Sequence, residues 1–112
     1  PWDLGKDVEG SSVCAPIKPM PGVIVGQGAL SMTVNGQVRQ QSNVDKLIWD
    51  VREIIADLSL FYHLQPGDLI FTGTPAGVGW SRKPPRFMKG GDVCEVEIEG
   101  IGTLRNPVVD QA

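Results

Sequence analysis

The sequence predicts a β-rich α+β fold with one main helix. Three features support this prediction: an alternating run around an Asn-Gly pair, one segment with helical periodicity, and 14 Gly and 9 Pro among 112 residues. Frequent Gly and Pro indicate many turns and short strands rather than a helical bundle. The expected order is hairpin, helix, strand, loop, strand, strand. That order is typical of a sheet with the helix packed across it.

Residues 29–41 carry the clearest strand pattern. Apolar side chains alternate with polar ones as far as Val34, and Asn35-Gly36 follows before a second run. Asn and Gly tolerate the positive φ that a two-residue type I′ turn requires at both central positions. The sequence therefore predicts an antiparallel hairpin at this point.

Residues 43–62 carry the helical pattern. Apolar side chains recur there in steps of three and four, and charged side chains occupy the opposite face. Ser42 and Asp45 resemble an N-cap pair. Pro66-Gly67 ends any continuation of the helix. The sequence therefore predicts one amphipathic helix of about 20 residues.

The rest of the chain reads as strands and loops. Residues 68–72 are apolar and follow a Pro-Gly turn, which predicts a buried strand. Residues 73–79 form a glycine-rich loop, and 80–91 form a basic, turn-rich excursion. We expect that excursion to be a solvated insertion, although its charges could also attract an anion. Residues 92–98 alternate like a half-exposed strand, and a last strand is expected near 103–109.

Composition excludes several classes of protein. A net charge of −3 and a pI of about 5.0 leave no basic footprint for nucleic acid or an anionic membrane surface. No apolar run reaches the roughly 20 residues that a transmembrane helix requires. Two cysteines cannot build a disulfide framework, so we expect a reducing, cytoplasmic setting.

The glycine-rich loop admits two interpretations. Glycines let backbone N–H groups approach an anion closely, and Thr74 adds a hydroxyl donor. The loop is neither a phosphate-binding Walker loop nor a dinucleotide fingerprint, because the Lys-Ser/Thr pair and the following helix are both missing. A plain connection between strands is the other interpretation, and the residues alone leave both open.

Lys6 also admits two interpretations. It lies in the segment Pro1-Trp-Asp-Leu-Gly-Lys6-Asp7, where bulky apolar residues flank the charge. A lysine in a partly desolvated site can polarise a carbonyl group or hold a water molecule. A solvated surface lysine is the commoner case when nothing else is known.

Two further sets of residues are rejected as sites. Glu95, Glu97 and Glu99 share one face of a strand, but the opposite face is apolar, so a solvated outer face explains them without a metal ion. The second set is a thiol with an imidazole base, which nothing in the sequence brings together: Cys14, Cys94 and His63.

Four stretches together resemble the fumarylacetoacetate hydrolase family. They are the loop sequence Asp-Leu-Ile-Phe-Thr-Gly-Thr-Pro-Ala-Gly-Val-Gly at 68–79, the hairpin at 34–40, the helix end at 58–64, and the opening Pro-Trp-Asp-Leu-Gly-Lys at 1–6. Their order and spacing match this family over nearly the whole chain. Within it the chain is most similar to the acylpyruvate hydrolases.

The resemblance implies a fold and an activity. The fold is a mixed β-roll, usually in a cytoplasmic homodimer that binds Mg²⁺ or Mn²⁺. The implied reaction is hydrolysis of a C–C bond in an acylpyruvate such as fumarylpyruvate, with release of pyruvate, as in the catabolism of aromatic compounds. The substrate would be a small dicarboxylic oxo-acid. An oxaloacetate decarboxylase or a hydroxymuconate-type isomerase or decarboxylase is the alternative within the family, and a non-catalytic β-rich binding module is the alternative outside it.

The resemblance also implies roles for individual residues. Lys6 is similar to the active-site lysine of the family, and Thr74, with Gly73 beside it, to the threonine that holds the substrate carboxylate. The metal ligands of the family, a Glu-x-Glu pair and an Asp, precede the Pro-Trp segment. We therefore expect residues 1–112 to be the C-terminal part of one catalytic domain, without metal ligands and inactive alone. Glu95-Val96-Glu97 lies after the loop and does not take that role.

Overall fold

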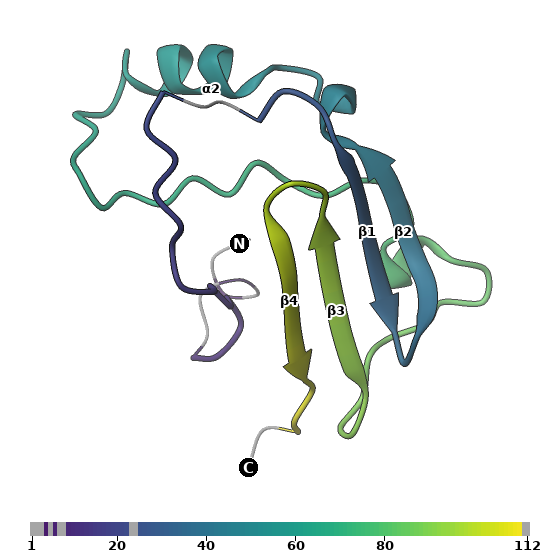
Figure 1. Ribbon diagram of the computed structural model, residues 1–112. Helices are drawn as coiled ribbons and strands as arrows, with labels where there is room; N and C mark the ends of the chain where they lie inside the picture. Colours follow the sequence, from purple (N-terminus) through teal and green to yellow (C-terminus); the bar gives the residue numbers. More distant parts are fainter. Residues whose placement is uncertain (1–3, 5, 7–8, 23–24, 111–112) are drawn as a thin grey trace.

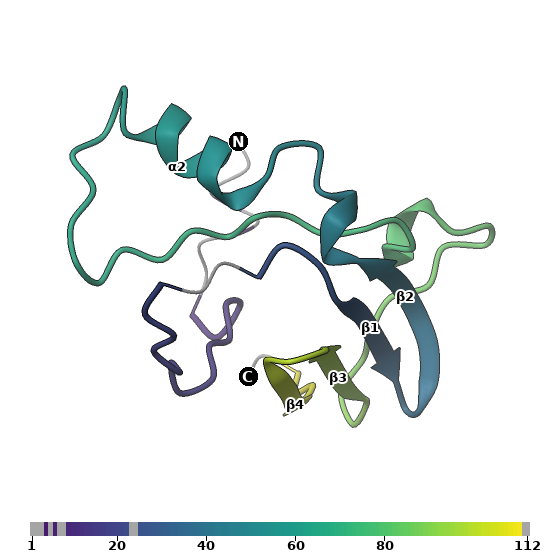
Figure 2. The same cartoon turned by 45° about the horizontal axis from the view of Figure 1, so that its top comes forward.

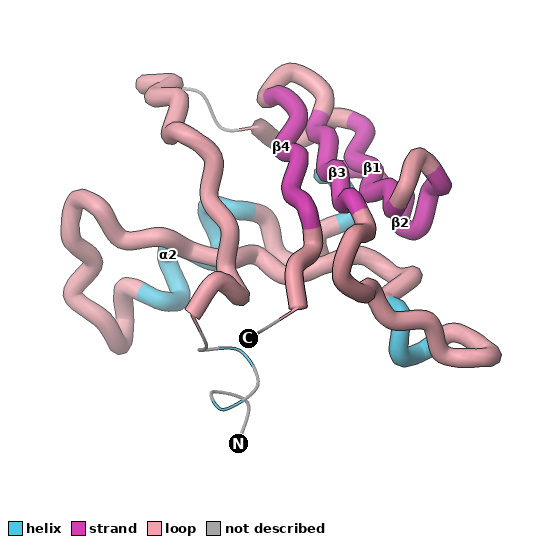
Figure 3. The backbone as a smooth tube through the Cα atoms, turned by 90° about the horizontal axis from the view of Figure 1, so that it is seen from below, coloured by secondary structure: helices cyan, strands magenta, loops and turns pink. Residues whose placement is uncertain are grey.

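The fold is organised around one four-stranded antiparallel sheet. The computed structural model describes residues 4, 6, 9–22 and 25–110. The strands lie side by side in the order β2-β1-β3-β4 (Figures 1 and 3). The regular elements, in chain order, are β1 (Ala29–Val34), β2 (Gln37–Asn43), the 3₁₀ turn η1 (Val44–Lys46), α2 (Val51–Leu58), the 3₁₀ turn η2 (Gly79–Ser81), β3 (Val93–Ile98) and β4 (Gly102–Pro107).

The predicted hairpin is confirmed. Strands β1 and β2 pair antiparallel, and Val34 lies opposite Gln37. Asn35 and Gly36 between them have φ angles of 51° and 74°, so both turn positions are left-handed, as the type I′ prediction requires. The predicted strands at 92–98 and near 103–109 are confirmed as β3 and β4, with boundaries shifted by one or two residues.

The hairpin turn is tied to the start of β3 by a side-chain network. The Asn35 side chain donates from Nδ2 to Oδ1 of Asp92 over 2.8 Å and accepts from the backbone N–H of Val93 over 2.8 Å. The backbone N–H of Lys89 donates to the other carboxylate oxygen of Asp92. Asp92 is only 9% exposed. Because charge-assisted hydrogen bonds favour the ionised form, the Asn35 bond, followed by the Lys89 bond, lowers the pKa of this carboxyl group.

The predicted helix over 43–62 is wrong in its extent. The chain forms a single 3₁₀ turn at 44–46, leaves it at Leu47, where ψ is 135°, and begins α2 only at Val51. Asp50 is the true N-cap, and its side chain and that of Glu53 form a reciprocal capping box. The apolar periodicity of the sequence continues through the 3₁₀ turn and α2, so periodicity alone does not reveal that the helix is interrupted between them.

The expected packing of this helix across the sheet is also wrong. The views in Figures 1 and 2 place α2 to one side of the sheet, and none of its residues is buried. No helix in the described part of the chain is long and apolar enough to cross a membrane. The amphipathic pattern therefore identifies an apolar face of α2 that the other described residues do not bury.

Residues 68–72 do not form the predicted buried strand. The segment is extended but pairs with no described strand, and Leu69 and Phe71 are 56% and 72% exposed. An apolar run becomes a strand only where a neighbouring strand supplies hydrogen-bond partners. The exposure of residues 68–72 is not exceptional, because no hydrophobic residue of the described chain is buried.

The Asp92 network predicts a specific sensitivity to acid. A lowered pKa in the folded state means that the carboxylate stabilises the protein above the ordinary Asp pKa of 3.8 and that this contribution is lost as pH falls through the lowered value. We expect Asp92→Asn to lower the urea midpoint at pH 7 and the gap from the parent to narrow below about pH 4.

The control for this measurement is Asp57→Asn, which alters an exposed carboxylate on α2. Urea titrations of parent and variants across pH provide the comparison. A gap for Asp92→Asn that is constant or widens on acidification contradicts the assignment.

Candidate functional site

The glycine-rich loop at 73–79 is fastened to β2 at two points. At the first, the side chain of Gln40 donates from Nε2 to Thr74 Oγ1 over 2.8 Å and to the Pro75 carbonyl oxygen over 2.7 Å. Gln40 is 8% exposed, and it and Asp92 are the two buried polar residues of the described chain. Thr74 itself stays exposed. The sheet therefore holds one side of the Thr74 hydroxyl and leaves the other toward solvent.

The second point of attachment is Arg82. Its guanidinium donates from Nε to the Gly77 carbonyl oxygen over 3.1 Å and from a terminal nitrogen to the Arg39 carbonyl oxygen on β2. One planar side chain thus bridges the loop and the strand, a use of several fixed donors that suits arginine. Arg82 is half-buried, so the expectation that 80–91 is wholly a solvated insertion is wrong at this residue.

Close packing explains two of the glycines in the loop. A Cβ added at Gly77 would lie 2.5 Å from the Arg39 carbonyl oxygen, and its φ of 109° is disfavoured for other residues. A Cβ at Gly79 would collide with the carbonyl oxygen of Arg86. Gly73 differs, because its φ is 96° but nothing lies within 4 Å of an added Cβ. The backbone of the loop is thus closely packed at Gly77 and Gly79 and has open space at Gly73.

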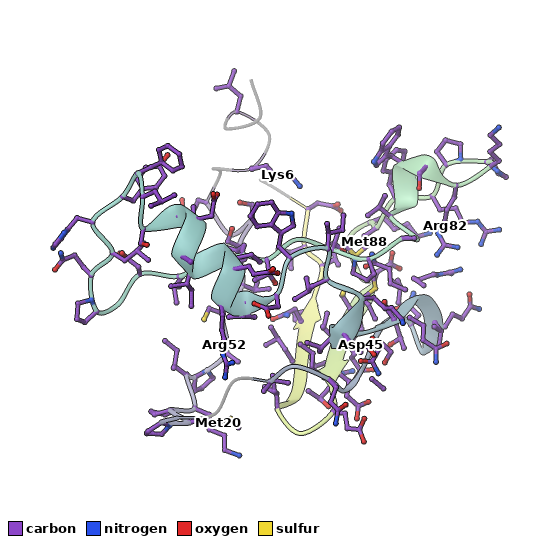
Figure 4. All side chains as sticks on the ribbon, turned by 90° about the horizontal axis from the view of Figure 1, so that it is seen from above. Lys6, Met20, Asp45, Arg52, Arg82 and Met88 are labelled. Carbon is purple, nitrogen blue, oxygen red and sulfur yellow. The ribbon has the colours of Figure 1, made fainter. Side chains whose placement is uncertain are left out.

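Lys6 lies on the N-terminal segment and is exposed. Its backbone carbonyl accepts a hydrogen bond from the Ser11 hydroxyl over 2.8 Å. Figure 4 shows its side chain well apart from Arg82, the residue that anchors the loop. No hydrogen bond joins Lys6 to Thr74 in the described part of the chain, and residues 1–3 and 5 of its motif lie outside that part. The role of Lys6 stays a prediction.

Two of the three carboxylates at 95–99 have structural partners. Glu95 pairs with Arg105 Nε at 3.3 Å across the β3–β4 ladder, and Glu99 accepts the backbone N–H of Ala29 over 3.0 Å. Within residues 4, 6, 9–22 and 25–110, no three His, Cys, Asp or Glu side chains group as a metal site. A divalent cation prefers several oxygen ligands at one point, so the described residues do not fit such an ion.

The thiols and the imidazole show no nucleophile. Partial burial, with a smaller effect from Glu95, raises the pKa of the Cys94 thiol, so the reactive thiolate is disfavoured near neutral pH. Cys14 is exposed, and its thiol donates to the neighbouring Ala15 carbonyl oxygen. His63 is exposed after the end of α2. The rejection of a thiol mechanism stays a prediction.

A cavity of about 530 Å³ opens between the hairpin and the loop at 77–92. Its apolar lining includes Met32, Val34, Phe87 and Met88, and its charged lining comprises Arg39, Arg82, Arg86, Lys89 and Asp92. Figure 4 shows Met88 and Arg82 on this side of the molecule. Two of the charges already have structural partners, since Arg82 holds the loop and Asp92 holds the hairpin turn.

The sequence did not reveal Gln40 or Arg82 as part of this site. Gln40 stands in the polar run 39–43, where every residue has a similar chance of being exposed. Arg82 stands among the charges and prolines of 80–91, a composition typical of solvated loops. No signal in a single sequence separates the two residues from their neighbours.

The chain belongs to the fumarylacetoacetate hydrolase family. Residues 1–109 match the family model described as "Fumarylacetoacetate (FAA) hydrolase C-terminal". The fold and the anchored loop therefore belong to a family of enzymes with small-molecule substrates.

Individual relatives narrow the comparison. The chain is 60% identical to fumarylpyruvate hydrolase from Ralstonia sp. over 104 residues, covering 93% of this chain and 50% of that protein. It is 41% identical to the mitochondrial oxaloacetate tautomerase fahd2 of Xenopus laevis over 110 residues, covering 96% of this chain and 34% of that one.

A solved structure adds a bound metal and ligand. Fumarylpyruvate hydrolase from Pseudomonas aeruginosa, in complex with Mn²⁺ and pyruvate, matches with 42% identity and a TM-score of 0.69, covering 77% of this chain and 34% of that one. The chain thus spans about half the length of the Ralstonia enzyme and about a third of the other two.

The close approach at Gly77 predicts that this position rejects any side chain. Gly77→Ala places a methyl group against the Arg39 carbonyl oxygen, so we expect it to lower the free energy of unfolding by about 1–3 kcal/mol. Chemical denaturation measures the change. Gly26→Ala is the control, because nothing lies within 4 Å of a Cβ there. Equal stability of the two variants contradicts the proposed packing.

Proposed function

We propose that these residues form the C-terminal part of a catalytic domain that hydrolyses a C–C bond in an acylpyruvate such as fumarylpyruvate and releases pyruvate. The observation that carries this proposal is the 60% identity with fumarylpyruvate hydrolase over 104 residues. The exposed hydroxyl of Thr74, held on β2, supports it as a point of contact for a carboxylate. The family β-roll, completed by further polypeptide, and a homodimer are part of the same proposal.

The proposed reaction is the addition of water followed by C–C cleavage, in which Thr74 and Lys6 have separate roles. Water adds to the carbonyl carbon of the acyl group, and the C–C bond to the pyruvate portion breaks. The electron pair of that bond passes to pyruvate as its enolate, which then takes up a proton at carbon. The Thr74 hydroxyl donates a hydrogen bond to the substrate carboxylate, and this bond fixes the orientation of the substrate. The Lys6 ammonium group stabilises the negative oxygen that develops as the bond breaks.

A divalent ion, Mg²⁺ or Mn²⁺, is included in the proposal. Support comes from the Pseudomonas relative, whose structure holds Mn²⁺ with pyruvate. Because the described carboxylates form no cluster for a cation, its ligands would lie outside the described residues. In the experiments that follow, the term full-length polypeptide means the longer protein, similar in length to the relatives, that the proposal requires and that contains residues 1–112.

An oxaloacetate-directed activity is the second candidate. It is favoured by the 41% identity with an oxaloacetate tautomerase over 110 residues. Such an enzyme would move a proton between carbon and oxygen, or release CO₂ if it were a decarboxylase, without consuming water. Assays of the full-length polypeptide separate these activities: pyruvate released from fumarylpyruvate, tautomer exchange of oxaloacetate, and CO₂ released from oxaloacetate. A hydroxymuconate-type isomerase would instead convert its substrate without cleavage.

The assigned roles predict loss of activity when either group is removed. We expect Thr74→Val and Lys6→Ala in the full-length polypeptide each to lower kcat/KM for fumarylpyruvate about tenfold or more, because each deletes one hydrogen bond or charge contact to an ionised oxygen. Pyruvate release measures the rates.

The matched controls make the same two substitutions at residues outside the proposed site. Thr103→Val removes an exposed threonine hydroxyl on β4, and Lys46→Ala removes an exposed lysine after β2. We expect both controls to stay within about twofold of the parent. If the two test variants also stay within that range, the roles of Thr74 and Lys6 are wrong.

The lack of a cation cluster among the described residues predicts the behaviour of the isolated 112-residue chain. We expect it to bind Mn²⁺ no more tightly than a surface carboxylate does and to release no pyruvate from fumarylpyruvate. Isothermal titration with Mn²⁺ and the pyruvate assay test this. Turnover by the isolated chain contradicts the proposal that it is one part of a catalytic domain.

A further inference from the structure

Gln40 is a buried polar side chain that touches the proposed substrate-binding residue. It lies on β2 opposite Met32 of β1 and is 8% exposed. Both of its described bonds end on the glycine-rich loop, one at Thr74 Oγ1 and one at the Pro75 carbonyl oxygen. Burial of an amide is unfavourable unless its hydrogen bonds are made, so these two contacts determine its orientation.

The Pro75 contact fixes which end of the amide faces the loop. A backbone carbonyl oxygen only accepts hydrogen bonds, so the atom 2.7 Å from it must be the NH₂ group of Gln40 and not its oxygen. The same nitrogen lies 2.8 Å from Thr74 Oγ1. The threonine hydroxyl therefore accepts this bond, and its own hydrogen is left to point elsewhere.

We propose that Gln40 is a positioning residue that makes the Thr74 hydroxyl a hydrogen-bond donor to the carboxylate of the substrate. The inference rests on the proposed function and deepens it. A hydroxyl that accepts from Gln40 presents its hydrogen to the exposed side, which suits a group that only accepts hydrogen bonds. An ionised carboxylate is such a group, whereas the NH₂ of a carboxamide is not.

Glutamine suits this position because its NH₂ group can donate to both acceptors, Thr74 Oγ1 and the Pro75 carbonyl oxygen. An ionised glutamate at this position would turn an acceptor toward the Pro75 carbonyl oxygen and provide no hydrogen for Thr74. A leucine would provide none either and would leave the Pro75 oxygen without this partner. With glutamate the Thr74 hydroxyl would donate to the new carboxylate, and with leucine it would be free to rotate, so in both cases its hydrogen is no longer held toward the ligand.

Kinetics of the full-length polypeptide test the inference. The carboxylate contact exists before and during the reaction, so losing its alignment weakens binding more than turnover. We expect Gln40→Leu to raise KM for fumarylpyruvate about tenfold, to leave kcat within about threefold, and to raise the inhibition constant of pyruvate in parallel. Gln41→Leu, at the exposed neighbouring position on β2, is the control and should leave KM within about twofold.

A double-mutant cycle separates positioning from a general structural role. In the Thr74→Val background no hydroxyl remains to be positioned, so Gln40→Leu should raise KM by less than about twofold there. The same rise in KM in both backgrounds overturns the inference, because Gln40 would then act independently of Thr74. If Gln40→Leu does not fold, Gln40→Met, which is unbranched like glutamine and carries no charge or donor, replaces it with the same expectations.

Failure of the inference and failure of the proposed function give different results. If Thr74→Val alone leaves kcat/KM unchanged, Thr74 does not hold the substrate, and both proposals about this residue are wrong. If Thr74→Val is impaired but Gln40→Leu adds a full, independent rise in KM, only the role of Gln40 is wrong. Loss of the preference for a carboxylate over a carboxamide ligand in Gln40→Leu supports the role.

Discussion

The attachment of the glycine-rich loop to strand β2 is the constraint on which the candidate site depends. The Gln40 amide holds residues 74 and 75, and the Arg82 guanidinium holds Gly77, both against the same strand. The absence of a side chain at Gly77 allows the backbones to approach that closely. Because β2 is itself fixed by the hairpin with β1, the position of the Thr74 hydroxyl is set by the sheet and not by the loop alone.

Polar contacts give this chain its shape, while its apolar surface is left uncovered. Hydrogen bonds of the ladder, the capping box of α2 and the Asn35–Asp92 network define the backbone, yet no described hydrophobic residue is buried. Exposed side chains such as Ile48, at 96%, normally need a partner surface. The relatives it matches are two to three times as long, which agrees with the proposal that further polypeptide covers this surface.

Local patterns of the sequence predicted the hairpin and the positions of the two remaining strands of the sheet, because Asn35-Gly36 and strict alternation depend only on neighbouring residues. The limits of the helix were missed because the apolar period runs on through the break at Leu47 and hides the start of α2 after the N-cap Asp50. The prediction of a strand at 68–72 was wrong because a strand requires a paired neighbour, which a single sequence does not reveal. Gln40 and Arg82 belong to the site through contacts over 34 and 43 residues, and no local pattern records such contacts.

We propose that β2, through Gln40, turns the Thr74 hydroxyl toward a carboxylate. A crystal structure of the full-length polypeptide with Mn²⁺ and pyruvate would test this arrangement. We expect a carboxylate oxygen of pyruvate within hydrogen-bond distance of Thr74 Oγ1 while Gln40 Nε2 still contacts that atom and the Pro75 carbonyl oxygen. Pyruvate bound away from Thr74, or a Gln40 side chain turned from the loop when pyruvate is bound, would contradict it.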